Sequence, residues 1–148
     1  MQKLAVTAAL LSLFTGCVVY SDGPAPPPHG SSAPPVFVNS PPSVYGADAG
    51  CYWDSTTGQD RWYFQASADD PDGVYDVVDM WAYVYDEWDG SLVQSFELYP
   101  TDDAYTWYTD YPAQSTGLDC WYSDYSVDFV AYDSYDDSDV MTVWANTY

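Results

Sequence analysis

Basic side chains are nearly absent from this chain. Its 148 residues include only 2 lysines and arginines, Lys3 and Arg61, against 23 aspartates and glutamates, so that the formal net charge is −21. Proteins that bind nucleic acids neutralise phosphates with clustered lysine and arginine, and a strongly negative surface repels such a backbone. The composition therefore excludes nucleic acid as a partner. It also excludes an anionic lipid surface, unless a covalent lipid holds the chain there.

Histidine and lysine are missing from the whole stretch between residues 43 and 148. Catalysis by a serine or cysteine nucleophile requires a neighbouring base, which is usually histidine. A glycosidase can instead use two carboxylates, but no pair among the 23 acidic residues stands out. The only histidine, His29, lies in a proline-rich segment. We therefore expect a protein that is not an enzyme.

Helix-forming patterns are absent as well. Only Glu87 and Glu97 are glutamates, and the other acidic residues are aspartates, which are poor helix formers and good turn formers. Tyrosine, tryptophan, valine and threonine dominate after Cys17, as they do in β-sheets. No stretch there repeats apolar residues at helical spacing. The composition predicts an all-β domain.

The first seventeen residues have the layout of a secretory signal. Lys3 precedes an apolar run from Leu4 to Phe14, and small residues precede Cys17. The run is shorter than the roughly 20 apolar residues that span a bilayer. One interpretation is an ordinary secretory signal with Cys17 merely close to it.

The ending of this segment supports a second interpretation. Phe14-Thr15-Gly16-Cys17 resembles the lipobox of bacterial lipoproteins. The resemblance implies removal of residues 1–16 and attachment of a diacylglycerol and a further acyl chain to Cys17, which would anchor the protein in a membrane. Val18 and Val19 follow in place of the aspartate of an inner-membrane retention signal. We therefore expect the outer membrane of a bacterial cell envelope.

Residues 17–42 and residues 43–148 differ in composition. The first range is rich in proline, glycine and serine, and we expect a spacer between the anchor and a folded domain. The second range has the size of one domain, and aspartate and glycine turns divide it into short runs at the spacing of a sandwich. We predict seven strands, at residues 43–47, 61–68, 77–85, 91–99, 104–109, 125–132 and 140–145.

Alternation along these strands predicts the core, because successive side chains of a strand point to opposite faces. The predicted inward set is apolar and of mixed size, as an interdigitated core requires. Its members are Trp62, Phe64, Ala66, Ala68, Val78, Met80, Ala82, Val84, Tyr125, Val127, Phe129 and Ala131.

Three stretches of the chain carry a likeness to a known fold. They are the entry segment Asn-Ser-Pro-Pro at 39–42, the acidic turn within residues 66–80, and the pair of runs 125–133 and 139–143. They resemble the corresponding parts of immunoglobulin-like domains of the bacterial, cadherin-like and fibronectin-III-like kind. The resemblance implies an Ig-like antiparallel β-sandwich of about seven strands, and it implies no particular activity.

We expect the three cysteines to have two different roles. If Cys17 carries lipid, Cys51 and Cys120 remain as an even pair. In an oxidising envelope compartment two such thiols commonly form a disulfide, and strands that alternate in direction place both at the same end of the sandwich. The alternative is two free buried thiols.

Alternating strand directions also gather acidic loops at the other end of the domain. So many like charges require a bound cation or full exposure to water, and Ca²⁺ suits an irregular set of oxygen ligands. The candidate ligands are Asp69, Asp70, Asp72, Asp102, Asp103, Asp133, Asp136, Asp137 and Asp139. The alternative is a solvated acidic rim without a metal.

Aromatic residues make up 19% of the chain, and several are predicted to point away from the core. Trp81, Tyr83 and Tyr85 share the outer face of the third predicted strand, and Trp88 follows in the next turn. Exposed rings of this kind mark contact sites, and rows of them resemble the ligand sites of carbohydrate-binding modules. The alternative is that cross-strand aromatic pairs only stabilise the sheet.

We therefore expect a lipid-anchored envelope protein whose N-terminal lipid holds it to the membrane. Its sandwich would be a non-catalytic module for binding, adhesion or scaffolding, with an envelope protein or a polysaccharide as partner. A carbohydrate-binding module that uses Trp81, Tyr83, Tyr85 and Trp88 is the alternative.

Overall fold

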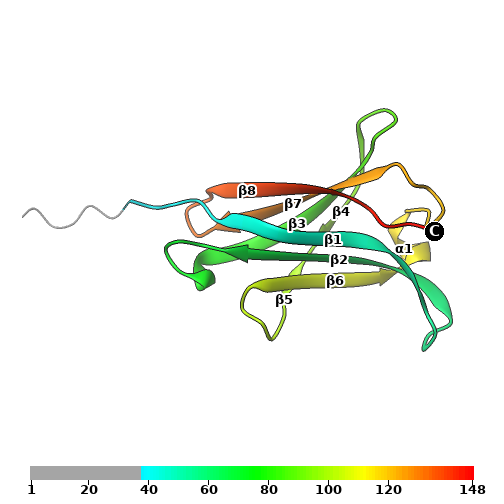
Figure 1. Ribbon diagram of the computed structural model, residues 1–148, viewed down its shortest axis with the longest axis horizontal. Coiled ribbons are helices and arrows are strands. Elements are labelled where there is room, and N and C mark those ends of the chain that lie inside the picture. The colour runs from blue at the N-terminus through cyan, green and yellow to red at the C-terminus, as the bar shows by residue number, and fades with distance from the viewer. Residues whose placement is uncertain (1–37) are drawn as a thin grey trace, which may run out of the picture. The chain divides into compact units, whose positions relative to one another are not determined.

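Residues 38–148 are described by the computed structural model, and they form two antiparallel β-sheets that pack face to face (Figure 1). The predicted signal peptide, the lipid site Cys17 and most of the predicted spacer lie outside the described residues. The elements are β1 (Ser43–Asp54), β2 (Gln59–Asp69), the 3₁₀ turn η1 (Val74–Asp76), β3 (Val77–Asp86), β4 (Ser91–Glu97), β5 (Tyr99–Pro100), β6 (Thr106–Pro112), the short helix α1 (Ala113–Thr116), β7 (Tyr125–Asp133) and β8 (Ser138–Trp144).

Each sheet contains four strands. The order is β1-β2-β6-β5 in the first sheet and β4-β3-β7-β8 in the second, and all neighbouring strands are antiparallel. The chain forms hairpins within a sheet and crosses between the sheets after β2, β4 and β6. This arrangement is the Greek-key topology of immunoglobulin-like sandwiches, so the predicted all-β, Ig-like fold is confirmed.

Two predicted strands differ most from the observed ones. β1 continues to Asp54, so that Cys51 lies inside a strand. The predicted strand 91–99 is two strands, β4 and β5, because the chain changes sheets at Leu98. Leu98 is buried there, and its N–H donates to a β3 carbonyl oxygen at 2.9 Å. A continuous run of β-forming residues carries no signal for such a change of sheet.

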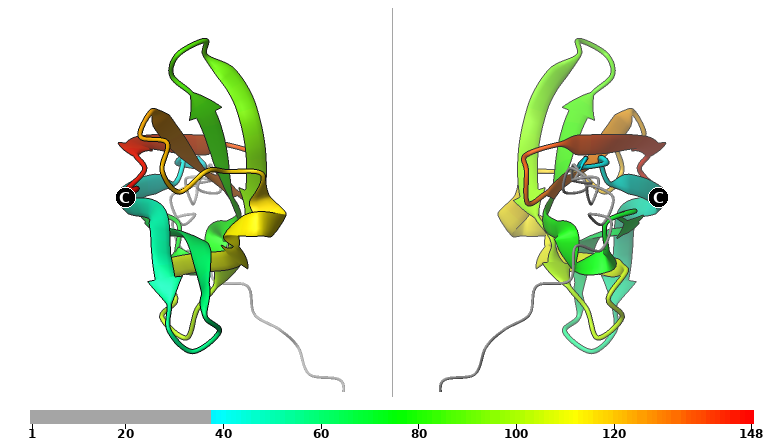
Figure 2. Two further views of the ribbon diagram at one scale, coloured as in Figure 1. Left: turned by 90° about the vertical axis from the view of Figure 1, so that its right-hand side faces the viewer. Right: turned by 90° about the vertical axis from the view of Figure 1, so that its left-hand side faces the viewer.

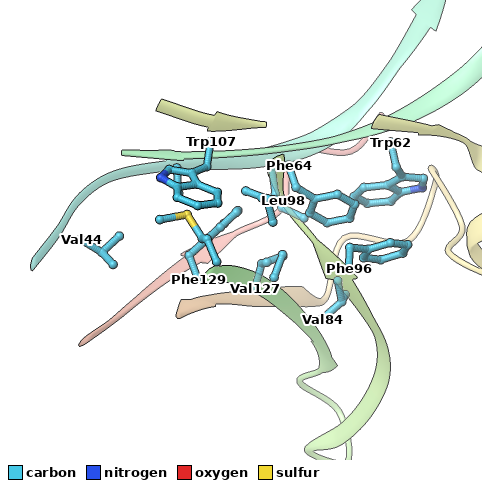
Figure 3. Close-up of a cluster of buried hydrophobic side chains, with 14 of the residues drawn as sticks. Val44, Trp62, Phe64, Val84, Phe96, Leu98, Trp107, Val127 and Phe129 are labelled. Carbon is cyan, nitrogen blue, oxygen red and sulfur yellow. The ribbon is translucent and has the colours of Figure 1, made fainter. Parts of the chain in front are cut away.

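The core lies between the sheets and consists largely of aromatic and small side chains (Figure 3). Trp62 and Phe64 project from β2 and are fully buried, and their rings stack with centroids 6.2 Å apart. Phe64 also stacks on Phe96 of the other sheet at 4.5 Å. Aromatic stacking across the two sheets thus takes the place of the leucine and isoleucine that this domain largely lacks.

Every predicted inward side chain except Val78 is buried. Val78 is 55% exposed, whereas Val77 is buried in its place. The reason is a β-bulge between Val77 and Asp79, where β3 slips in register against β7. Alternation alone does not reveal where a bulge inserts an extra residue.

Tyr125 begins β7 and holds the loop that leads into it. Its hydroxyl accepts a hydrogen bond from the backbone N–H of Asp119 at 3.3 Å. Its buried ring contacts Trp62 and Tyr122 edge-on, with centroids 5.9 and 4.8 Å apart. A tyrosine in this place that bonds back to the preceding corner is a hallmark of immunoglobulin-like sandwiches. The corner orients the loop that carries Cys120.

Cys51 of β1 and Cys120 of the loop before β7 form the predicted disulfide. Their Cα atoms are 5.5 Å apart, and 69 positions separate them in the sequence. Both cysteines are buried. The bond ties an edge strand of the first sheet to the connection that enters the second, and it excludes the alternative of two free thiols.

The C-terminal segment runs parallel to β1 and joins the two sheets along one side. Asn146 donates its backbone N–H to the Ala49 carbonyl and accepts from the Cys51 N–H at its own carbonyl, each at 2.8 Å. The two backbones approach most closely at Gly50. An added Cβ there would lie 2.5 Å from the Asn146 carbonyl oxygen and 2.9 Å from its Cβ. A glycine is therefore required at this position.

Removal of the disulfide should destabilise the domain. Closing a loop of this length lowers the entropy of the unfolded chain and contributes about 4 kcal/mol in the chain-entropy model. We expect the double variant Cys51→Ala/Cys120→Ala to unfold at a lower urea concentration than the wild type, and reduction should lower the wild-type midpoint similarly. The double variant serves as the control and should not respond to the reductant. A wild-type midpoint that reduction leaves unchanged would contradict the prediction.

The substitution Gly50→Ala should lower the free energy of unfolding by roughly 1–3 kcal/mol, the usual range for overpacking. Gly46→Ala is the matched control on the same strand, because there the nearest atoms to an added Cβ belong to Ser67 at 3.8 and 3.9 Å. Urea denaturation measures both variants. Equal stability of the two would mean that the C-terminal segment does not pack on β1 at Gly50.

Candidate functional site

The acidic loops lie together at the end of the sandwich where the described chain begins, as the strand alternation predicts (Figure 1). Hydrogen bonds connect the entry segment to these loops. The side-chain amide of Asn39 donates to Asp133 at 2.7 Å and to Asp137 at 2.9 Å, and the Ser40 backbone N–H donates to Asp72 at 2.8 Å. We call this end the acidic pole, comprising residues 38–42, 69–76, 101–105 and 133–137.

Three carboxylates of the acidic pole meet at one point. One oxygen each of Asp70, Asp76 and Asp133 lies within 4.8 Å of the other two. Asp70 follows β2 in the first sheet and Asp133 ends β7 in the second, so that the group spans both sheets. Asp70 and Asp133 are only 4% and 1% exposed, whereas Asp76 is partly exposed. We call these three residues the carboxylate cluster.

Asp133 is well supplied with hydrogen-bond donors. Its Oδ1 accepts from the backbone N–H groups of Tyr135 and Asp137, each at 2.8 Å, and its Oδ2 accepts from Asn39. Burial by itself raises the pKa of Asp133, but these hydrogen bonds stabilise the carboxylate and bring its pKa below the usual value. Asp133 is therefore ionised at neutral pH.

Asp70 has fewer donors. Its Oδ1 accepts from the Asp72 backbone N–H at 2.7 Å, but its buried Oδ2 has no hydrogen-bond partner within residues 38–148. Burial raises the pKa of Asp70, and the negative charges of Asp76, Asp72 and Asp133 raise it further, against the lowering effect of the Asp72 N–H. The surroundings of Asp70 thus disfavour its charged form unless a positive charge is added.

Of the nine aspartates predicted as calcium ligands, the structure brings only Asp70 and Asp133 together in the carboxylate cluster. The short aspartate side chain bonds to the donors nearest to it, and this disperses the remaining seven. Five of them accept hydrogen bonds from their own loops or from Asn39, Ser40 and Val44, and they are Asp69, Asp72, Asp103, Asp137 and Asp139. The other two, Asp102 and Asp136, are exposed in their loops.

Asp76 is absent from the predicted ligand set. It closes the turn η1, in which its N–H donates to the Gly73 carbonyl oxygen at 2.7 Å, and this turn brings its side chain back towards Asp70. The Ser134 hydroxyl donates to Asp76 and connects η1 to the loop after β7. The signal that could have identified it is the Asp72-Gly73 turn with an aspartate three residues beyond the glycine.

The predicted aromatic row occupies the outer face of β3. Trp81, Tyr83 and Tyr85 are half-buried there. The rings of Trp81 and Tyr83 stack with centroids 6.3 Å apart, and the Trp81 indole N–H donates to Asp79 at 2.8 Å. Trp88 lies in the turn between β3 and β4 and is 86% exposed, so it belongs to the hairpin tip. These contacts agree with the interpretation in which the rings on β3 stabilise the sheet.

The exposed tryptophans lie on segments at the end of the sandwich opposite the acidic pole, and this end faces the viewer in the left view of Figure 2. The four indole side chains there are between 59% and 86% exposed. We call this end the tryptophan pole, and its indoles are Trp53, Trp88, Trp121 and Trp144.

Two adjoining hollows of about 260 and 350 Å³ open at the tryptophan pole. Both are lined by Asp60, Ala113 and Gln114, so the two hollows lie next to each other. Trp53 lines one hollow and Trp121 lines the other. We call the two hollows together the Trp53–Trp121 groove. It combines two aromatic rings with carboxylate and amide groups.

The two rings of this groove are adjacent to the two disulfide cysteines in sequence. Trp53 is two residues beyond Cys51, and Trp121 directly follows Cys120. The disulfide therefore holds both rings at the same end of the sandwich. Trp121 also packs on Tyr148, with ring centroids 5.0 Å apart. The aromatic neighbours of the cysteines are the signal by which the sequence could have identified the groove.

No family model, no curated protein and no solved structure matches this chain. The function is therefore inferred from the chain's own residues and their geometry. Within residues 38–148, no helix has the length and apolar character needed to cross a membrane.

Proposed function

We propose that this protein is anchored in a bacterial outer membrane through lipid on Cys17 and displays its sandwich as a non-catalytic binding module. The difference between the two ends of the domain supports this proposal. The described chain begins at the acidic pole, and the exposed indoles of the tryptophan pole lie at the opposite end of the sandwich (Figure 1). Clustered exposed apolar side chains mark contact sites on soluble domains. A tether at Cys17 leaves this end free to meet a partner in the envelope.

The chemistry of the domain suits binding rather than catalysis. Histidine and lysine do not occur within residues 38–148, so histidine, the most frequent proton-transfer base, is missing there. Arg61 is engaged by Asp110, with Nε and Oδ2 2.6 Å apart. Most of the aspartates named above accept hydrogen bonds that hold loops in place. The surface therefore presents aromatic rings and hydrogen-bonding groups to a partner.

A neutral polysaccharide is the ligand class that the Trp53–Trp121 groove fits best. Indole rings provide flat apolar surfaces for sugar rings, while Asp60 and Gln114 lie between them as hydrogen-bonding groups for hydroxyls. The large negative charge of the chain repels anionic glycans. We propose this groove, rather than the packed row on β3, as the carbohydrate site of the domain.

The anchor is tested by growing cells that express the full-length chain with a clickable fatty-acid analogue. We expect the wild type to be labelled and to sediment with membranes, and Cys17→Ser to lose the label and the membrane association. The double variant Cys51→Ser/Cys120→Ser is the control, and it should keep the label because it retains Cys17. Label that persists in Cys17→Ser would refute lipidation at this residue.

The groove is tested by retention of the detergent-solubilised protein on insoluble neutral polysaccharides. Trp53→Ala and Trp121→Ala should each weaken binding by roughly threefold to tenfold, the effect of losing one aromatic contact. Trp88→Ala is the matched control, because Trp88 is at least as exposed but lies on the β3–β4 hairpin, which diverges from the β1–β2 hairpin (Figure 2). Loss of retention in Trp81→Ala with both groove variants unaffected would instead place the sugar on β3.

A further inference from the structure

We infer that Asp70, Asp76 and Asp133 bind a Ca²⁺ ion that joins the two sheets at the acidic pole. The site lies at the opposite end of the sandwich from the Trp53–Trp121 groove, and it does not depend on the proposed function. Its three carboxylates come from the loop after β2, from η1 and from the end of β7.

The spacing of the carboxylate oxygens matches a single shared ion. Calcium binds oxygen ligands at about 2.3–2.6 Å, so two oxygens on opposite sides of one ion are at most about 5 Å apart. One oxygen of each cluster member lies within 4.8 Å of the other two. Each of the three can therefore reach the same ion without rearrangement of the strands.

Two buried oxygens beside the cluster have no hydrogen bond from any group within residues 38–148. They are Oδ2 of Asp70 and Oδ1 of Asn39. Asp70 is almost completely buried, and the negative charges of Asp76 and Asp133 act on it. The Asn39 amide lies next to the cluster, because its nitrogen is 2.7 Å from Asp133. Buried polar atoms normally have partners, and a cation held by the cluster would satisfy Oδ2 of Asp70.

Protein side chains do not supply that cation. Arg61 is the only lysine or arginine within residues 38–148, and it forms an ion pair with Asp110 of β6. The cluster has two buried members and no positively charged neighbour among these residues. Mutual repulsion of such groups is relieved by a bound positive ion.

The donor set favours calcium over other metals. All ligands are oxygens, which excludes the thiolate and imidazole sites typical of zinc and copper. Magnesium requires near-octahedral geometry and keeps several waters, whereas calcium accepts six to eight oxygens in irregular arrangements. The three carboxylates provide at least three oxygens, and water can approach through the partly exposed Asp76 to supply others.

A bound ion would complement the disulfide. The Cys51–Cys120 bond holds the tryptophan pole, whereas at the acidic pole the hydrogen bonds of Asn39 and Ser40 connect the loops to the entry segment. Calcium at the cluster would connect the end of β2 in one sheet to the end of β7 in the other. It would also fix the point at which the chain enters the sandwich.

Calcium should bind the chelator-treated full-length protein with a Kd of roughly 0.1–1 mM, the range of extracellular calcium modules. At about 10 mM CaCl₂ the thermal midpoint should rise by at least roughly 5 °C, because an ion that binds only the folded state stabilises it. The same concentration of MgCl₂ should give less than roughly half of that rise. Titration calorimetry and differential scanning calorimetry measure the two quantities.

Asp70→Asn tests the cluster with little change in shape, because an asparagine oxygen can still accept from the Asp72 N–H. This variant should lose the calcium-dependent rise, while its calcium-free midpoint stays at or above that of the wild type, since one repelling charge is gone. Asp76→Asn, at the partly exposed member, is a second variant and should also lose the rise.

Asp136→Asn is the matched control. Asp136 is exposed in the neighbouring loop and has a φ of 65°, which asparagine tolerates. It removes one charge from the acidic pole without touching the cluster, so the full calcium response should remain. A wild-type midpoint that calcium does not raise, or that magnesium raises equally, would overturn the inference. So would a full calcium response in both Asp70→Asn and Asp76→Asn.

Discussion

A hydrogen bond from a backbone N–H to an aspartate side chain recurs at the turns of this sandwich. In each case the carboxylate accepts from the N–H two residues later in the chain. The aspartates are Asp54, Asp70, Asp86, Asp89, Asp103, Asp119 and Asp133. Aspartate favours this closed turn, and these seven turns account for part of the excess of aspartate over glutamate in the sequence. Part of the acidity of the chain is thus a property of its turns, and the rest of the fold must accommodate the charge.

Tyrosine hydroxyls donate hydrogen bonds to several of the carboxylates. Tyr63 donates to Asp48 at 2.8 Å, and Tyr122 donates to Asp86 at 2.7 Å. The hydrogen bond to Asp86 raises the pKa of Tyr122 to about 12, so that the phenol stays protonated and remains a donor. Hydrogen bonds to ionised acceptors are stronger than those between neutral groups. Tyrosine hydroxyls therefore serve as donors to carboxylates in a chain that contains few lysines.

The two ends of the sandwich are stabilised in different ways. At the tryptophan pole the Cys51–Cys120 disulfide closes the structure, and it also positions the rings of the Trp53–Trp121 groove. At the acidic pole the supply of N–H and hydroxyl donors ends at Asp70, whose Oδ2 has none within residues 38–148. The disulfide stabilises one end of the sandwich covalently. A bound ion at the carboxylate cluster would stabilise the opposite end electrostatically.

The sequence by itself determined the properties that depend on near neighbours. Strand alternation identified the buried faces of β2, β3 and β7 apart from the bulge at Val78, and alternating strand directions placed the cysteines and the acidic loops at opposite ends. Only the tertiary structure decided which distant side chains meet. The change of sheet at Leu98, the return of Asp76 towards Asp70, and the groove formed between Trp53 and Trp121 depend on packing across the two sheets. Periodicity reports the face on which a residue lies, whereas contacts between remote loops follow from how the sheets are twisted and joined.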